Sequence, residues 1–228
     1  MRIDLSLSYR LGENLDREWA EDANADELWD AVNILDASPS IGKNQLEQLA
    51  QRGSAVAMMH LGDALIYGRC GIAANLKEGE NWLLRSAEGG SVEGRFRLAN
   101  FYVRQKRDRE ALSHWIKLAD WGYSPAIFYL GYCHYHGLLG LEVNLEQAIR
   151  HWRLAHQSGH FHAGIWLAQT YETDRSGLLK RIAGFWIRLK LFIPFVWYWL
   201  RYPTSDRLRL PWRSKKLDER LDEYEAEH

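Results

Sequence analysis

Histidines are the residues whose number and spacing in this chain could do chemistry. Imidazole is a common zinc ligand, but histidines at i and i+2 on a helix point to different faces. No matching set of cysteines or carboxylates accompanies them. His114 and His151 also take the same place in successive sequence units, which packing explains better than metal binding. We therefore expect no metal site and no cofactor. The seven histidines in this region are His114, His134, His136, His151, His156, His160 and His162.

Other signs of catalysis are also missing from the sequence. It has no glycine-rich phosphate loop, no G-x-S-x-G and no H-E-x-x-H. Cys70 and Cys133 fall at different places in the units, so we expect free thiols rather than a disulfide framework. Residues 1–22 lack a basic stretch followed by an apolar run, so we expect no secretory signal. These features favour a non-enzymatic, cytoplasmic protein.

Charge is unevenly distributed along the 228 residues, although the net charge is −1. Residues 1–53 carry eleven acidic and five basic side chains, whereas residues 175–216 carry eleven basic side chains and one acidic one. Residues 217–228 form an acidic tail. Because the net charge gives no general attraction to phosphate, we do not expect a nucleic-acid partner. The basic segment suggests either an interaction surface or pairing with the acidic end.

The elements that would position any functional side chain come from an internal repeat. Glycines at 53, 90, 122 and 159 are separated by 37, 32 and 37 residues. A leucine followed by a small residue recurs at the same spacing, and a period of this length indicates stacked supersecondary units. The pairs are Leu61-Gly62, Leu98-Ala99, Leu130-Gly131 and Leu167-Ala168. The units predicted are 54–90, 91–122, 123–159 and the start of a fourth at 160–175.

Each unit shows two helical patterns joined by a loop. Glycine within a helix costs about 1 kcal/mol relative to alanine, so Gly62 and Gly131 indicate that another backbone approaches closely. Asn75 and Asn144 are placed to cap the second helices. The loops before them share a Gly-x-x-Gly pattern that starts at Gly68 and Gly137 and allows positive φ. Three tryptophans are expected in the core between units: Trp82, Trp115 and Trp152.

The N-terminal segment, residues 1–53, is expected to end in a degenerate helix pair that caps the repeat array. Residues 24–36 have Leu28, Val32 and Leu35 on one helical face, and residues 44–51 predict a second helix.

This pattern resembles the Sel-one-like repeat family, relatives of the tetratricopeptide repeats. The segment Ala126-x-x-x-Leu130-Gly131, followed by Trp152, Ala155 and Gly159, matches the family consensus best. Trp115 and Trp152 stand one place later than in the consensus, and His134 replaces its usual tyrosine. The resemblance covers residues 54–175. It implies an all-α, right-handed superhelical solenoid of helix-turn-helix repeats with divergent terminal caps, acting as a protein-binding scaffold.

A second stripe on the first helices varies between units while its neighbours stay constant. By resemblance, the first helices line a groove, so this stripe is the predicted binding surface for a protein or peptide partner. Its side chains are polar, basic or aromatic, and tyrosine, tryptophan and arginine are frequent at interface hot spots. An ordinary solvated helix face is the alternative interpretation. The stripe comprises His60, Asp63, Tyr67, Arg97, Asn100, Arg104, Tyr129, Tyr132, His136, Trp166, Gln169 and Thr173.

The C-terminal segment, residues 176–216, is apolar and basic. Three interpretations compete: a helix that closes the array, a helix that lies on an anionic membrane surface, or a helix that spans a membrane from about 182 to 200. Two charges near the centre of that span would each cost roughly 2.5–3.5 kcal/mol. The residues predicted to contact a membrane under the second interpretation are Trp186, Arg188, Lys190, Trp197, Trp199 and Arg201.

The sequence therefore predicts a non-catalytic interaction scaffold or adaptor. One alternative is a membrane-associated adaptor anchored through residues 178–216, which would lie at the inner face of a membrane. Another, taken from the family resemblance, is an inhibitor or immunity-type protein that blocks a cognate toxin or enzyme.

Overall fold

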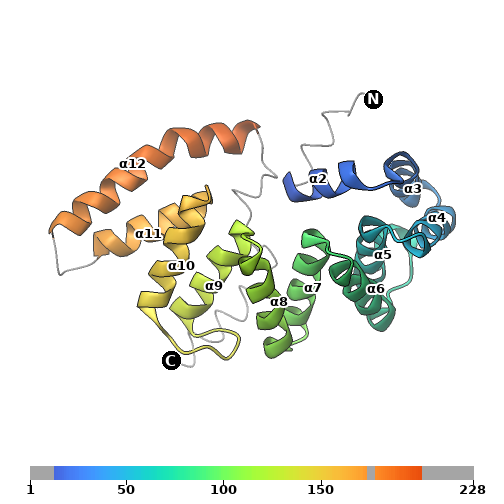
Figure 1. The fold of residues 1–228 in the computed structure, drawn as a ribbon, viewed down its shortest axis with the longest axis horizontal. Coiled ribbons are helices and arrows are strands. Elements are labelled where there is room, and N and C mark those ends of the chain that lie inside the picture. The colour runs from blue at the N-terminus through green and yellow to red at the C-terminus, as the bar shows by residue number, and fades with distance from the viewer. Residues whose placement is uncertain (1–12, 174–177, 202–228) are drawn as a thin grey trace. The chain divides into compact units, whose positions relative to one another are not determined.

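The computed structural model describes residues 13–173 and 178–201, and every regular element among them is a helix (Figure 1). The predicted all-α class and its helix-turn-helix repeats are confirmed. The described residues form two compact units, 13–102 and 103–201, and the division falls inside the predicted array. Each unit is described by itself.

The first unit contains the N-terminal helices and the first complete repeat. Helix α2 was not predicted, while α3 and α4 are the expected pair; α4 begins earlier than predicted because Pro39 occupies its first turn. Gly42 lets these two helices meet closely: a Cβ there would lie 2.7 Å from Leu35 Cα. The helices are α2 (Glu13–Glu21), α3 (Ala25–Ala37), α4 (Pro39–Gln51), α5 (Ala55–Tyr67), the short η1 (Arg69–Gly71), α6 (Leu76–Glu88) and α7 (Val92–Arg104), whose last two residues belong to the second unit.

Local capping sets the ends of α5 and α6. The Asn75 side chain accepts a hydrogen bond from the Glu78 amide at 3.2 Å, and its own amide group donates to the Glu78 carboxylate at 3.0 Å. Gly68 ends α5 in the left-handed conformation with φ of 60°. Both predictions from the sequence are confirmed, because these interactions depend on residues that are close along the chain.

Helices α5 and α6 approach each other almost backbone to backbone, as the glycine at 62 predicted. A Cβ on Gly62 would lie 2.7 Å from Leu83 Cγ and 3.0 Å from the Gly79 carbonyl oxygen. The prediction for Trp82 was wrong: Leu83 fills the core position, while Trp82 is half-buried with the Arg85 guanidinium 4.4 Å from its ring.

The second unit has the same helix cap and the same close helix contact at a glycine, with different side chains. Asn144 accepts a hydrogen bond from the Gln147 amide at 3.0 Å, and a Cβ on Gly131 would lie 2.6 Å from Trp152 Cδ1. Trp115 and Trp152 are fully buried, as predicted. The helices here are α8 (Asp108–Asp120), α9 (Ser124–His136), α10 (Leu145–Gln157), α11 (Phe161–Thr173) and α12 (Leu178–Arg201).

Helix α12 packs along α11, and the contact is close at Gly164, where a Cβ would collide with Leu191. The Phe195 ring lies 6.0 Å from that of Phe161 and 5.9 Å from that of His162. Among the described residues, no helix is both long and apolar enough to cross a membrane. Residues 182–200, one predicted alternative for a span, do not meet that condition.

Candidate functional site: two first-helix surfaces

In residues 13–102 the predicted stripe is a network of paired charges rather than an open surface. Asp63 is buried on α5 and forms ion pairs with Arg97 of α7 and with Arg69, the latter at 3.3 Å. Arg97 also donates to Glu93 at 3.0 Å. Because these charges already satisfy one another, Asp63 serves the packing of adjacent first helices and is too buried to contact a partner in this structure. Tyr67 and Asn100 are half-buried.

The N-terminal ends of α5 and α7 carry the same arrangement of a serine and a carboxylate. The Ser54 hydroxyl accepts from the Ala57 amide at 3.0 Å and donates to Asp22 at 2.6 Å. The Ser91 hydroxyl accepts from the Gly94 amide at 2.8 Å and donates to Glu18 at 2.5 Å. Ser54 and Ser91 are 37 residues apart, the repeat spacing, whereas Glu18 and Asp22 are one helical turn apart on or just after α2.

Glu18 makes two further contacts, accepting hydrogen bonds from the Val92 amide at 2.8 Å and the Glu93 amide at 3.1 Å. A carboxylate in this place satisfies amides that a helix N-terminus leaves unpaired. Burial nevertheless raises the pKa of Glu18 above its ordinary value, and the Ser91 hydroxyl and these two amides oppose that shift. The α2 segment is therefore tied to both first helices of this unit.

Trp19 extends the α2 contact onto the predicted stripe itself. Its ring lies 5.5 Å from that of His60 and 6.0 Å from that of Trp29. Burial, followed by the charges of Arg97 and Arg69, lowers the pKa of His60 to about 3. In this unit the predicted stripe is thus partly covered by the chain's own N-terminal helix. The sequence did not reveal this, although Glu18 and Asp22 are spaced to lie on one helix face.

In residues 103–173 the stripe divides into buried and accessible parts. Tyr129 and Tyr132 are 1% and 5% exposed, so neither can contact a partner directly in this structure. Tyr129 instead packs against Trp115, with ring centroids 4.5 Å apart. Arg104 and Gln169 are exposed. The side chain of Thr173 lies outside the described residues.

The accessible part of the stripe belongs to an aromatic cluster centred on Trp166, which is half-buried on α11, and Tyr132 and Trp152 form the buried base of this cluster. Tyr132, Tyr135, His136 and Trp152 surround its indole, and with Trp166 they are called the Trp166 cluster below. Their ring centroids lie 5.5, 5.6, 6.1 and 5.2 Å from that of Trp166, in the same order. Tyr135 is 39% exposed. The stripe positions read from the sequence missed it, because it lies one place before His136 along α9.

Among the described residues, neither the histidines nor the cysteines form a recognisable reactive centre. Across residues 13–173 and 178–201, no three His, Cys, Asp or Glu side chains are placed to hold a metal ion. The rings of His134 and His151 stack with centroids 5.3 Å apart. Both cysteines are free. The Cys70 thiol donates to Asp36 at 2.8 Å, and burial together with that carboxylate raises its pKa to about 11, which suppresses the reactive thiolate.

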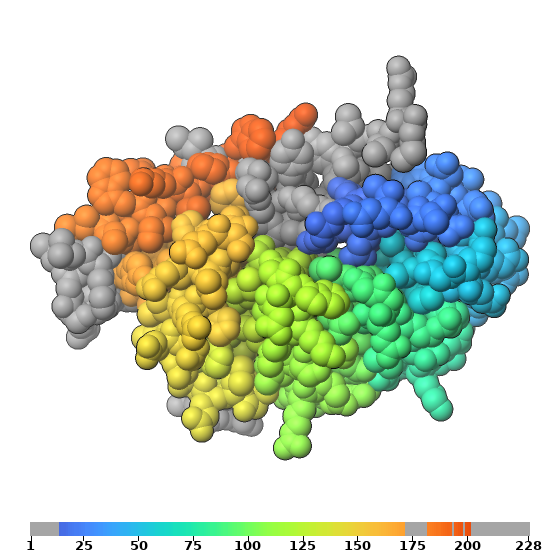
Figure 2. Space-filling model, in the orientation of Figure 1, coloured from blue at the N-terminus to red at the C-terminus, as the bar shows by residue number. Residues whose placement is uncertain are grey.

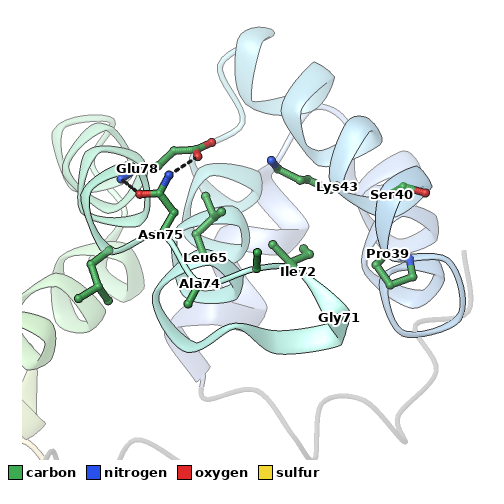
Figure 3. Close-up of a pocket in the computed structure, with 11 residues that line it drawn as sticks. Pro39, Ser40, Lys43, Leu65, Gly71, Ile72, Ala74, Asn75 and Glu78 are labelled. Atoms are coloured by element: carbon green, nitrogen blue, oxygen red, sulfur yellow. Dashed lines mark hydrogen bonds between the residues drawn. The ribbon is translucent and has the colours of Figure 1, made fainter.

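A hollow of about 870 Å³ lies beside α4 and the loop from η1 to α6 (Figure 3). Three of its polar side chains are already paired: Asn75 and Glu78 are hydrogen-bonded to each other, and Lys43 forms an ion pair at 3.3 Å with Glu47, which does not line the hollow. Apolar side chains such as Pro39 and Ile72 line the rest. This arrangement does not converge polar groups on a ligand position, so the hollow is a weaker candidate than the Trp166 cluster.

Comparison with known proteins agrees with this architecture. The family model described as Sel1 repeat matches residues 55–91 and 124–160, which correspond to α5–α6 and α9–α10. The chain therefore contains two segments that match the Sel1 repeat. Sel1 repeats usually mediate protein–protein interactions, and the family generally consists of non-catalytic scaffolds.

Solved structures show the same fold. A Sel1 repeat protein from Oxalobacter formigenes is 18% identical with a TM-score of 0.61, over 76% of this chain and 53% of that one. A protective antigen of uropathogenic Escherichia coli with an SLR fold is 21% identical with a TM-score of 0.55, over 67% and 34%. This chain thus spans about a third to a half of these two relatives. An immunity protein from Pseudomonas aeruginosa is 16% identical over 88% of this chain and 86% of that one, but its TM-score of 0.38 supports no inference about function.

Proposed function

We propose that this protein is a non-catalytic scaffold that binds a protein partner through the Trp166 cluster. The observation that carries the proposal is the convergence of five aromatic rings on α9, α10 and α11, with Tyr135 39% exposed and Trp166 half-buried. Rings that are already packed against one another offer a large contact area, and they lose little conformational entropy when a partner binds. Such residues carry a large share of the binding energy at interfaces.

The neighbouring groups define the kind of partner segment that fits. His136 belongs to the cluster, and Gln169 is an exposed polar residue three positions after Trp166 on α11. Arg153 donates to the Tyr171 hydroxyl at 3.0 Å and adds a cation near the end of α11. A segment that inserts an apolar or aromatic side chain against Trp166, and pairs its polar groups with His136 and Gln169, would complement this surface. The predicted stripe residues of 13–102 contribute less, because Trp19 of α2 contacts His60 and because Asp63 and Arg97 form an ion pair with each other.

The test is affinity purification followed by mass spectrometry and measurement of Kd for the recovered partner. We expect Tyr135→Ala and Trp166→Phe each to weaken binding by roughly tenfold or more, the effect of losing about 1.4 kcal/mol of interface energy. Trp166→Phe is used because it keeps a ring in the core.

Trp121→Ala is the matched control, since Trp121 is a 49% exposed ring that does not belong to the cluster. Circular dichroism verifies that each variant keeps its helix content. A Kd unchanged by Tyr135→Ala and Trp166→Phe, or equally weakened by Trp121→Ala, would overturn the assignment of the binding surface.

A further inference from the structure

Helix α12 has two faces, and one of them is accounted for by packing on α11. Gly184 is buried, and Ile187, Leu191 and Phe195 follow at helical spacing, all half-buried. Leu191 packs directly against Gly164 of α11, and Phe195 packs beside Phe161. This inner face explains why the helix is attached, but nine of the described apolar side chains of α12 lie outside it and are exposed.

The opposite side of α12 is apolar and exposed. Figure 2 shows the helix, in orange, at the surface of the molecule. With 3.6 residues per turn, its side chains cover an arc of roughly 160°. They are between 36% and 67% exposed. This outer face of α12 consists of Ile182, Phe185, Trp186, Leu189, Phe192, Val196, Trp197, Trp199 and Leu200. Exposed apolar patches of this kind mark sites of association.

Cationic residues border the outer face on both sides. In the same helical projection Arg188 falls at one edge of the apolar arc, and Lys190 and Arg201 fall at the other. Helix α12 contains no aspartate or glutamate. Long cationic side chains can lie along apolar surface while their charged ends reach polar surroundings.

This charge pattern favours one of two possible binding partners for the outer face, a second copy of the chain or an anionic lipid surface. A second copy of the chain would bring the cationic edges of two α12 helices together without any acidic residue on either helix to compensate. An anionic lipid surface instead supplies phosphates to both edges while the apolar arc enters the boundary between headgroups and acyl chains. Tryptophans are enriched at that depth, and Trp186, Trp197 and Trp199 are each more than half exposed.

We propose that the outer face of α12 is an interfacial membrane-binding surface that recognises anionic lipid headgroups. The helix lies flat on the bilayer, about 36 Å long at 1.5 Å per residue, with Phe185, Leu189 and Phe192 among the inserted side chains. The repeats, attached through α11, would then be presented at a membrane surface. This proposal is independent of partner binding at the Trp166 cluster.

The experiment is vesicle flotation of the full chain. One arm uses phosphatidylcholine vesicles and the other uses vesicles that also contain phosphatidylserine. We expect flotation with the anionic vesicles, little with the neutral ones, and weakening by added salt. Leu189→Glu and Phe185→Glu should each weaken partitioning by about tenfold or more, equivalent to ~1.4 kcal/mol.

Leu154→Glu is the matched control, because Leu154 is an exposed leucine on α10, 46% accessible, outside the proposed surface. All three glutamates replace exposed side chains, so circular dichroism should show an intact fold. Absence of flotation with anionic vesicles would overturn the proposal. So would flotation that Leu189→Glu and Phe185→Glu leave unchanged, or self-association in analytical ultracentrifugation that Leu189→Glu abolishes while flotation persists.

Discussion

The two serine–carboxylate contacts between α2 and the first helices make a sharp prediction, centred on Glu18→Ala. This substitution removes three hydrogen bonds, to the Ser91 hydroxyl at 2.5 Å and to the amides of Val92 and Glu93 at 2.8 and 3.1 Å. Ser91 would keep its own bond from the Gly94 amide. The substitution therefore removes the attachment of α2 to α7 but leaves the Ser91 cap of α7 in place.

The expected magnitude follows from two opposing effects. A hydrogen bond to a charged group contributes about 1.5–3 kcal/mol, and loss of a helix cap costs about 0.5–2 kcal/mol. Against this stands the desolvation that raises the pKa of Glu18. We expect Glu18→Ala to lower the free energy of unfolding by about 1–2 kcal/mol, with a coupling to Ser91→Ala of about 1 kcal/mol in a double-mutant cycle.

Urea denaturation followed by circular dichroism measures these quantities. Glu21→Ala is the control on the same helix, because Glu21 is exposed, and it should change stability by less than about 0.5 kcal/mol. Because the folded-state pKa of Glu18 is raised from 4.5, its contribution grows as pH falls from above the folded-state pKa towards 4.5. The cost of Glu18→Ala should therefore be larger near pH 4.5 than at neutral pH. A cost no larger than that of Glu21→Ala would refute the proposed attachment.

Two further predictions concern the first helices. The pKa of His60 is about 3 in the folded protein and about 6.5 when unfolded, so this group loses stabilisation as pH falls from 6.5 towards 3. His60→Gln should flatten the dependence of the free energy of unfolding on pH in that range, and an unchanged slope would contradict it. Gly131→Ala should destabilise the protein by about 1–3 kcal/mol despite alanine's better helix propensity, because its Cβ would lie 2.6 Å from Trp152 Cδ1. A rise in Tm would show that α9 and α10 can separate to accept a methyl group.

Much of the fold was predictable because it depends on contacts within one repeat. Asn75 and Asn144 cap their helices through amides three residues away, and Gly68 and Gly137 end theirs with φ near 60–67°. Which residue of a helix faces the core was harder to predict. Trp82 and Leu83 are adjacent large apolar residues, and only their placement against Gly62 shows that Leu83 is the core residue.

The candidate site was predicted in part, since Trp166 and His136 were in the expected stripe and Tyr135 was not. Sequence spacing places a side chain on a helix face but does not reveal how much of that face a neighbouring helix covers. Burial of Tyr129 and Tyr132 depends on packing against residues such as Trp115, on another helix.

By itself, the sequence determined the repeat, its caps and its close helix contacts, because the same residue types recur at a fixed spacing and act locally. Only the tertiary structure decided that α2 joins the N-termini of α5 and α7, through residues such as Glu18 and Ser91 that lie 73 positions apart. It also decided which face of α12 packs on α11 and which remains exposed. An almost wholly apolar helix gives little periodicity from which to choose an inner side, so the choice came from the fit of Leu191 against Gly164.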